Sequence, residues 1–176
     1  MSHVLQKLRG GDLRSIGRSN EVVQDVLEDP ALFAEVFEGL FSDDPRVRMR
    51  SADVLEKLSA KRPELLQPFK ERLIHQVARI PQQEVQWHAA QMFSYLETSQ
   101  AERDEFLRIL LSYIDTAKST IVKVCAMQAL ADLAVRDETI RLEILGKLKE
   151  LVDTGSPAVV SRGRKLIKRL SEEVHG

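Results

Sequence analysis

The residues best suited to chemistry in this chain are its histidines and its single cysteine. His75 and His88 are far apart, neither precedes a Glu, and the sequence has no His-x-x-x-His pair that would hold a metal on one helix face. Gly10-Gly11 does not lead into a phosphate-binding loop, and Cys125 lies in an apolar segment that predicts a buried, unreactive thiol. We therefore expect no enzyme activity, no metal and no cofactor.

Other residues are suited to binding. Arg162, Lys165 and Arg169 have the spacing i, i+3, i+7, which predicts a basic row along one side of a helix. Such a row fits an acidic partner, or simply the solvated end of the molecule. Arg46 and Arg50 also share one side of a helix, and guanidinium groups recognise carboxylates and phosphates. Ordinary exposed ion pairs with neighbouring acids are the alternative for these two arginines.

Trp87 and His88 form the most distinctive single spot in the sequence. Trp87 falls in a mostly apolar position of the repeat described below, so partial burial between helices is one interpretation. The other is that Trp87 anchors a partner, because tryptophan and arginine dominate the energetics of protein interfaces. The candidate contact residues are Arg46, Arg50, Trp87, His88, Arg162, Lys165 and Arg169.

An internal repeat determines how these residues are positioned. DDPRVRMRSADVLEKL at position 43 matches PQQEVQWHAAQMFSYL at 81, KSTIVKVCAMQALADL at 118 and GSPAVVSRGRKLIKRL at 155, with offsets of 38, 37 and 37 residues. The matching positions are apolar or small and recur at i, i+4, i+7, i+8 and i+11, which is one face of an α-helix. They include the columns Val47, Val85, Val122, Val159; Ser51, Ala89, Ala126, Gly163; and Leu58, Leu96, Leu133, Leu170.

A second apolar segment precedes each of these helices, so the repeating unit is predicted to be a pair of helices. The four pairs fall at about 30–60, 63–97, 100–135 and 138–172. Asp44-Pro45 places a capping side chain before a proline at the first helical position, and Ser99 with Glu102 forms a capping box. Residues 1–28 break the register, and we expect one or two short helices after Gly10-Gly11 that cap the array. The prediction is one all-α domain over residues 1–176.

The overall composition limits the classes of partner. The net charge is −1, which makes nucleic acid an unlikely ligand. No apolar run is long enough for a signal peptide or a membrane span, and one cysteine cannot form an internal disulfide. The expected location is the cytoplasm, and the sequence gives no indication of oligomeric state.

The repeat resembles the HEAT-repeat family, with the armadillo repeats as the next most similar. The residues that carry the resemblance are Asp44-Pro45, Val47-Arg48, Ser51-Ala52 and Val54-Leu55. It implies a right-handed α-solenoid whose second helices line a concave surface, acting as a non-enzymatic scaffold for a protein partner. Two alternatives remain open: a nucleic-acid-binding protein similar to HEAT-like DNA glycosylases, and a lyase subunit that works only with a partner.

Overall fold

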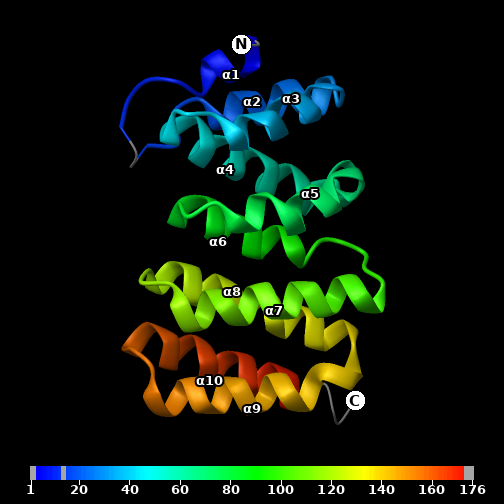
Figure 1. Ribbon diagram of the computed structural model, residues 1–176, viewed down its shortest axis with the longest axis vertical. Helices are drawn as coiled ribbons and strands as arrows, with labels where there is room; N and C mark the ends of the chain where they lie inside the picture. Colours follow the sequence, from blue (N-terminus) through cyan, green and yellow to red (C-terminus); the bar gives the residue numbers. More distant parts are fainter. Residues whose placement is uncertain (1–2, 13–14, 173–176) are drawn as a thin grey trace. The chain divides into compact units, whose positions relative to one another are not determined.

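The structure is a computed structural model that describes residues 3–12 and 15–172. Every regular element in these residues is a helix, which confirms the all-α prediction (Figure 1). The chain divides into two compact units, one ending at Glu97 and the other beginning at Thr98. Residues 1–2, 13–14 and 173–176, which belong to the predicted N-terminal cap and the C-terminal end, lie outside the described residues.

The first unit consists of short helices around one long helix. Helix α4 packs against α2 and α3 on one side and against α6 on the other. Gly10-Gly11 follows α1 instead of preceding all the helical structure, so one of the two N-terminal helices begins earlier than expected. The elements are α1 (His3–Lys7), α2 (Ser19–Glu28), α3 (Leu32–Glu38), η1 (Gly39–Phe41), α4 (Pro45–Lys61), η2 (Pro63–Leu65), η3 (Gln67–Phe69), α5 (Lys70–His75), η4 (Val77–Arg79) and α6 (Gln83–Phe93).

The second unit consists of longer helices joined by tight turns. α7 packs against α8, α9 against α10, and the two second helices α8 and α10 contact each other (Figure 1). The capping box predicted at Ser99 and Glu102 is present at the start of α7. The elements are α7 (Gln100–Thr116), α8 (Thr120–Arg136), η5 (Glu138–Ile140), α9 (Arg141–Thr154) and α10 (Pro157–Glu172).

The repeated columns form the core in both units. The valine, small-residue and leucine columns are buried at all of their positions. In the small-residue column, a Cβ added to Gly163 would lie 2.7 Å from Cγ2 of Val152, which is too close for an ordinary contact. Helices α9 and α10 can therefore pack at their present separation only because this position has no side chain.

The segment before α6 departs from the predicted continuous helix. Residues 63–79 contain three short 3₁₀ turns and only one short α-helix, α5. Pro68 lies inside this segment and has no N–H to donate to a preceding carbonyl, and its ring obstructs the previous turn. The sequence pattern thus placed the segment correctly but overestimated its regularity. In the residues that the structure describes, no helix combines the length and apolar character needed to cross a membrane.

Candidate partner-binding surfaces

The second helices carry every candidate contact residue. In the first unit these helices are α4 and α6, and in the second they are α8 and α10. One column of the repeat lies next to the buried columns, at the boundary between the core and the surface. It holds Arg50, His88, Cys125 and Arg162. Three of these four are not fully buried, whereas Arg50 is covered by another part of the chain.

Arg50 is 1% exposed, although the sequence placed it at a partner-binding surface. The loop between α1 and α2 wraps around its guanidinium group. Nη1 donates to the carbonyl oxygens of Leu8 at 2.8 Å and Gly10 at 2.6 Å, and Nη2 donates to that of Asp12 at 3.0 Å. Nε donates to the carbonyl oxygen of Ser15 at 3.0 Å. In this structure Arg50 organises the N-terminal loop and does not face an external partner.

Glycines allow the loop to approach the guanidinium group closely. Gly10, Gly11 and Gly17 all have positive φ, which L-residues with side chains rarely adopt. A Cβ at Gly17 would lie 2.9 Å from Cζ of Arg50. A larger residue would therefore be strained by the positive φ and would also collide with the guanidinium group. The sequence could not predict this arrangement, because the acceptors are backbone carbonyl oxygens, which every residue type has.

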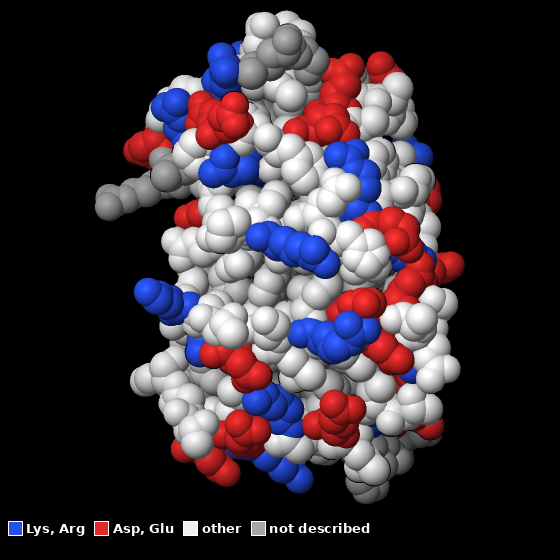
Figure 2. All heavy atoms as spheres, in the orientation of Figure 1, with Lys and Arg blue, Asp and Glu red and all other residues white. Residues whose placement is uncertain are grey.

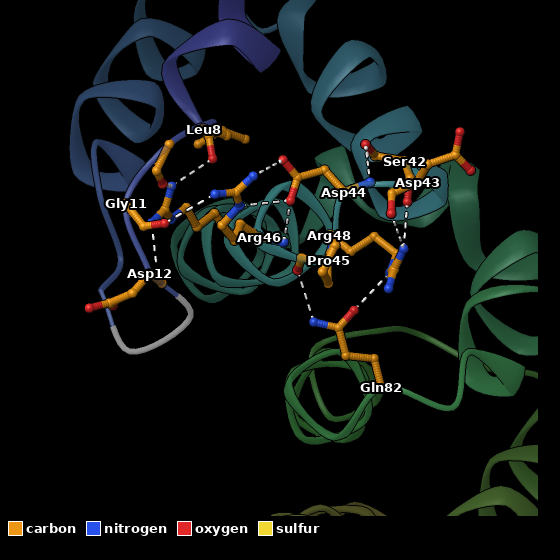
Figure 3. A network of polar contacts seen from close by, with 12 residues as sticks. Leu8, Gly11, Asp12, Ser42, Asp43, Asp44, Pro45, Arg46, Arg48 and Gln82 are labelled. Carbon is orange, nitrogen blue, oxygen red and sulfur yellow. Dashed lines mark hydrogen bonds and ion pairs between the residues drawn. The ribbon is translucent and has the colours of Figure 1, made fainter.

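Arg46 and Arg48 also lie on α4, but only Arg46 points towards this loop (Figure 3). Arg46 pairs with the carboxylate of Asp44 at 2.9 Å and also donates to the carbonyl of Gly11 at 3.2 Å. Its side chain remains 40% exposed, so a partner can reach it. Arg48 instead donates to the carbonyls of Ser42 and Asp43 and to the amide oxygen of Gln82, which joins two turns of the first unit.

Asp44 is the negative end of this network. Its carboxylate accepts from the backbone N–H of Arg46 at 2.9 Å, as the sequence-predicted cap of α4. The hydrogen bond from the Arg46 side chain is the main cause that lowers the pKa of Asp44 to about 2, assisted by the backbone hydrogen bond. Asp44 is consequently ionised at neutral pH and stabilises the first turn of α4.

Trp87 and His88 line a cavity of about 330 Å³. Its walls come from α4, from α6 and from the N-terminal loop, which contributes Ser15 and Ile16. Both aromatic residues are half-buried, with ring centroids 5.7 Å apart, so the indole is neither fully packed nor fully solvent-exposed. The remaining lining residues are Met49, Arg50, Asp53 and Glu84.

The cavity keeps His88 neutral. Burial lowers the pKa of His88 to about 4; Lys57 acts in the same direction, whereas Asp53 and Glu84 oppose the shift. The Nδ1 atom is buried and has no hydrogen-bond partner among the described residues. At neutral pH the ring therefore adds no positive charge to the cavity, and one of its nitrogens can still accept a hydrogen bond.

In the second unit, α10 carries the predicted basic row. Arg169 pairs with Asp132 of α8 at 2.6 Å, and Arg162 donates to the amide oxygen of Gln128 at 3.0 Å. Gln128 in turn donates to Asp132 at 3.0 Å, which links the four side chains across the two helices. Lys165 lies between the two arginines, is exposed, and makes no hydrogen bond or ion pair within the part of the chain that is described. Among the described residues, Arg169 is thus the member of the row that is paired with a carboxylate.

An exposed apolar residue lies on α8, the helix that Arg162 and Arg169 contact. Ile121 lies two helical turns before Gln128 on the same side of α8 and is 54% exposed. Cys125 lies between them and is half-buried, so the sequence prediction of a buried thiol overestimated its burial. In the space-filling view, basic and acidic side chains are otherwise interspersed in small groups over the face shown (Figure 2).

The described residues contain no group of three or more His, Cys, Asp or Glu side chains able to hold a metal ion. Comparisons with curated proteins and with solved structures gave no significant match. A family model described as a HEAT repeat domain matches residues 12–170, which is nearly the whole chain. Together with the helical repeat and its buried columns, this match shows that the chain belongs to the HEAT-repeat family.

Proposed function

We propose that this protein is a non-enzymatic binding module that presents the surface of its second helices to an acidic protein partner. HEAT repeats generally serve as protein-interaction scaffolds, and the family is typically non-catalytic. The proposed architecture is a right-handed solenoid of four helix pairs, acting as a single domain over residues 1–176. Its support is the burial of the same repeat columns in all four segments.

The observation that carries the proposal is the basic row on α10. Arg162, Lys165 and Arg169 point to the same side of the helix, and the interactions of Arg162 and Arg169 with α8 hold their side chains in place. Because these two side chains are already ordered, less conformational entropy is lost when a partner's carboxylates bind to them. Exposed Ile121, two turns before Gln128 on α8, can receive an apolar side chain from the same partner.

The proposed contacts in the first unit are weaker. Arg46 is one partly exposed cation and not part of a row of three, while Trp87 and His88 are half-buried around their cavity. Arg50 acts indirectly, by holding the loop that forms one wall of that cavity. We therefore assign the acidic partner to the basic row of the second unit.

A charge-reversal experiment tests this assignment. A labelled glutamate-rich peptide with a central leucine is titrated into wild-type protein and into Lys165→Glu, with a glutamine-rich peptide as the neutral control. Arg164→Glu is the matched variant, because Arg164 is also exposed on α10 and points away from the row. We expect Lys165→Glu to weaken binding about tenfold and Arg164→Glu to have little effect. Equal weakening by the two variants would contradict the proposed surface.

Nucleic acid can be tested with the same proteins, because the basic row could also contact phosphates. Duplex and single-stranded oligonucleotides are titrated at low salt and again at higher salt. Each phosphate contact releases counterions, so true nucleic-acid binding weakens steeply as salt rises. Tight, salt-sensitive binding of an oligonucleotide together with no response to the acidic peptide would replace the protein-binding proposal with this alternative.

A further inference from the structure

We propose that the cavity between α4, α6 and the N-terminal loop receives an arginine side chain from a protein partner. The inference rests on the proposed function only in that the arginine belongs to a binding partner. None of the residues that line the cavity belongs to the basic row on α10, and the ligand carries the opposite charge. Either proposal can consequently fail without the other.

The size and walls of the cavity fit one long side chain. A volume of about 330 Å³ is at the lower end of the range of roughly 300–1,000 Å³ found for ligand pockets. Trp87, Met49 and Ile16 supply apolar wall area, and Ile16 is still 44% exposed at the rim. An arginine side chain has an apolar stem and a planar head that stacks on an indole ring, so both parts find suitable surfaces here.

The lining residues include two carboxylates and one guanidinium group, Arg50, and the resulting net charge of −1 favours a cation. Asp53 and Glu84 contribute two carboxylates from two different helices. Asp53 also accepts from Lys57 at 2.7 Å, which leaves Glu84 as the carboxylate with fewer competing contacts. The only hydrogen bond to the side chain of Glu84 in the described residues comes from its neighbour Gln83, at 3.2 Å. A guanidinium group in the cavity can form an ion pair with Glu84 without displacing a structural arginine or lysine.

Two positive charges lie at or beside the cavity, and each has its own contacts. Arg50 lines the cavity and keeps its charge, but the loop carbonyl oxygens that accept from its guanidinium group offset part of that charge. Lys57 is held by Asp53 and by the amide oxygen of Asn20 at 3.0 Å. His88 is neutral at physiological pH because of its burial, so it adds no positive charge that would repel a cation. The indole of Trp87 in the wall favours the planar guanidinium group, which can stack on it, over the compact ammonium of lysine.

Trp87 makes the proposal directly measurable, because it is the single tryptophan of the chain. A short blocked peptide with one arginine among alanines is titrated into the full-length protein while tryptophan fluorescence is recorded. The same peptide with citrulline keeps the shape of the side chain but removes its charge, and a third peptide carries lysine. The expected result is a saturable change with arginine that is about five- to tenfold weaker with lysine and absent with citrulline.

Two carboxylate variants complete the experiment. Glu84→Gln should weaken arginine binding about five- to tenfold, because it removes the charge and keeps the size of the side chain. Glu71→Gln removes an exposed carboxylate of the same unit outside the cavity and should leave binding unchanged. Unchanged circular dichroism and melting temperature show that both variants are folded.

Several results would overturn the proposal. They are the absence of a saturable response to arginine in wild-type protein, an equal response to citrulline, and equal effects of the two carboxylate variants. Lysine binding as tightly as arginine would overturn the guanidinium assignment. Because the acidic-peptide titration uses a different surface and a ligand of opposite charge, its outcome remains independent of these results.

Discussion

The most direct test of the N-terminal arrangement is the replacement of Arg50 by methionine. Methionine fills much of the same space but cannot donate to the carbonyls of Leu8, Gly10, Asp12 and Ser15. A buried acceptor left without a donor costs about 1–3 kcal/mol. The four costs do not add fully, because the loop lies at the surface and water can reach its carbonyls once it moves away. We therefore expect the free energy of unfolding of the first unit to fall by about 3 kcal/mol.

Two measurements check this expectation in separate ways. Urea denaturation followed by Trp87 fluorescence reports the first unit, and hydrogen exchange followed by mass spectrometry reports the loop itself. Peptides that contain the hydrogen-bonded amides of Leu8, Arg9 and Gly17 should exchange faster in Arg50→Met, whereas peptides from α9 and α10 should not change. The matched variant is Arg46→Met, because Arg46 lies one turn away, is 40% exposed and donates only one hydrogen bond to the loop.

The refuting result is equally specific. If Arg50→Met loses less than about 0.5 kcal/mol, as an ordinary surface substitution does, and the loop exchanges at its wild-type rate, Arg50 does not hold the loop. If Arg46→Met has the same effect as Arg50→Met, general loss of positive charge would explain the result instead of the four specific hydrogen bonds. Arg46→Met is expected to cost only about 0–1 kcal/mol, the range for exposed ion pairs.

Three further predictions concern the repeat core and one helix cap. Leu96→Ala or Leu133→Ala should each lower the free energy of unfolding by about 2–5 kcal/mol in chemical denaturation, because both leucines are buried; a loss typical of a surface site would contradict the repeat register. Ala126→Arg should be far more damaging than Arg164→Ala, since the first position is fully buried and the second exposed, and comparable melting temperatures would refute this. Asp44→Ala should cost about 1 kcal/mol at neutral pH. Because folding lowers the pKa of Asp44 from 3.8 to about 2, this contribution is complete above the unfolded pKa and is lost as the pH falls through the folded one; a difference between wild type and variant that is undiminished at pH 2 would contradict the assignment.

The sequence predicted the helices and their buried faces well because both depend on local periodicity. The leucine column Leu58, Leu96, Leu133 and Leu170 is buried at all four positions, since the 3.6-residue period assigns these residues to one face before any tertiary contact is known. The caps of α4 and α7 were also predicted, because capping depends on residues only two or three positions apart.

The candidate site was less accessible to sequence reasoning. The cavity beside Trp87 depends on Ser15 and Ile16, which a loop brings to α4 from far away in the sequence. Arg50 was assigned to the surface because a charged side chain at the edge of a helix face is usually solvated, and its backbone acceptors left no pattern to detect. The break in the helix before α6 did have a signal, namely Pro68, whose effect on helix geometry was underestimated.

The way the N-terminal loop recognises Arg50 also has an evolutionary consequence. Since main-chain oxygens do the recognising, most side chains between α1 and α2 can be exchanged without altering the bonds to the guanidinium group. The length of the connection is more constrained, because deleting one residue would move every later carbonyl oxygen away from the guanidinium group. Related chains should therefore preserve the number of residues in this connection, and glycine at positions 10, 11 and 17, more strictly than the identity of its other residues.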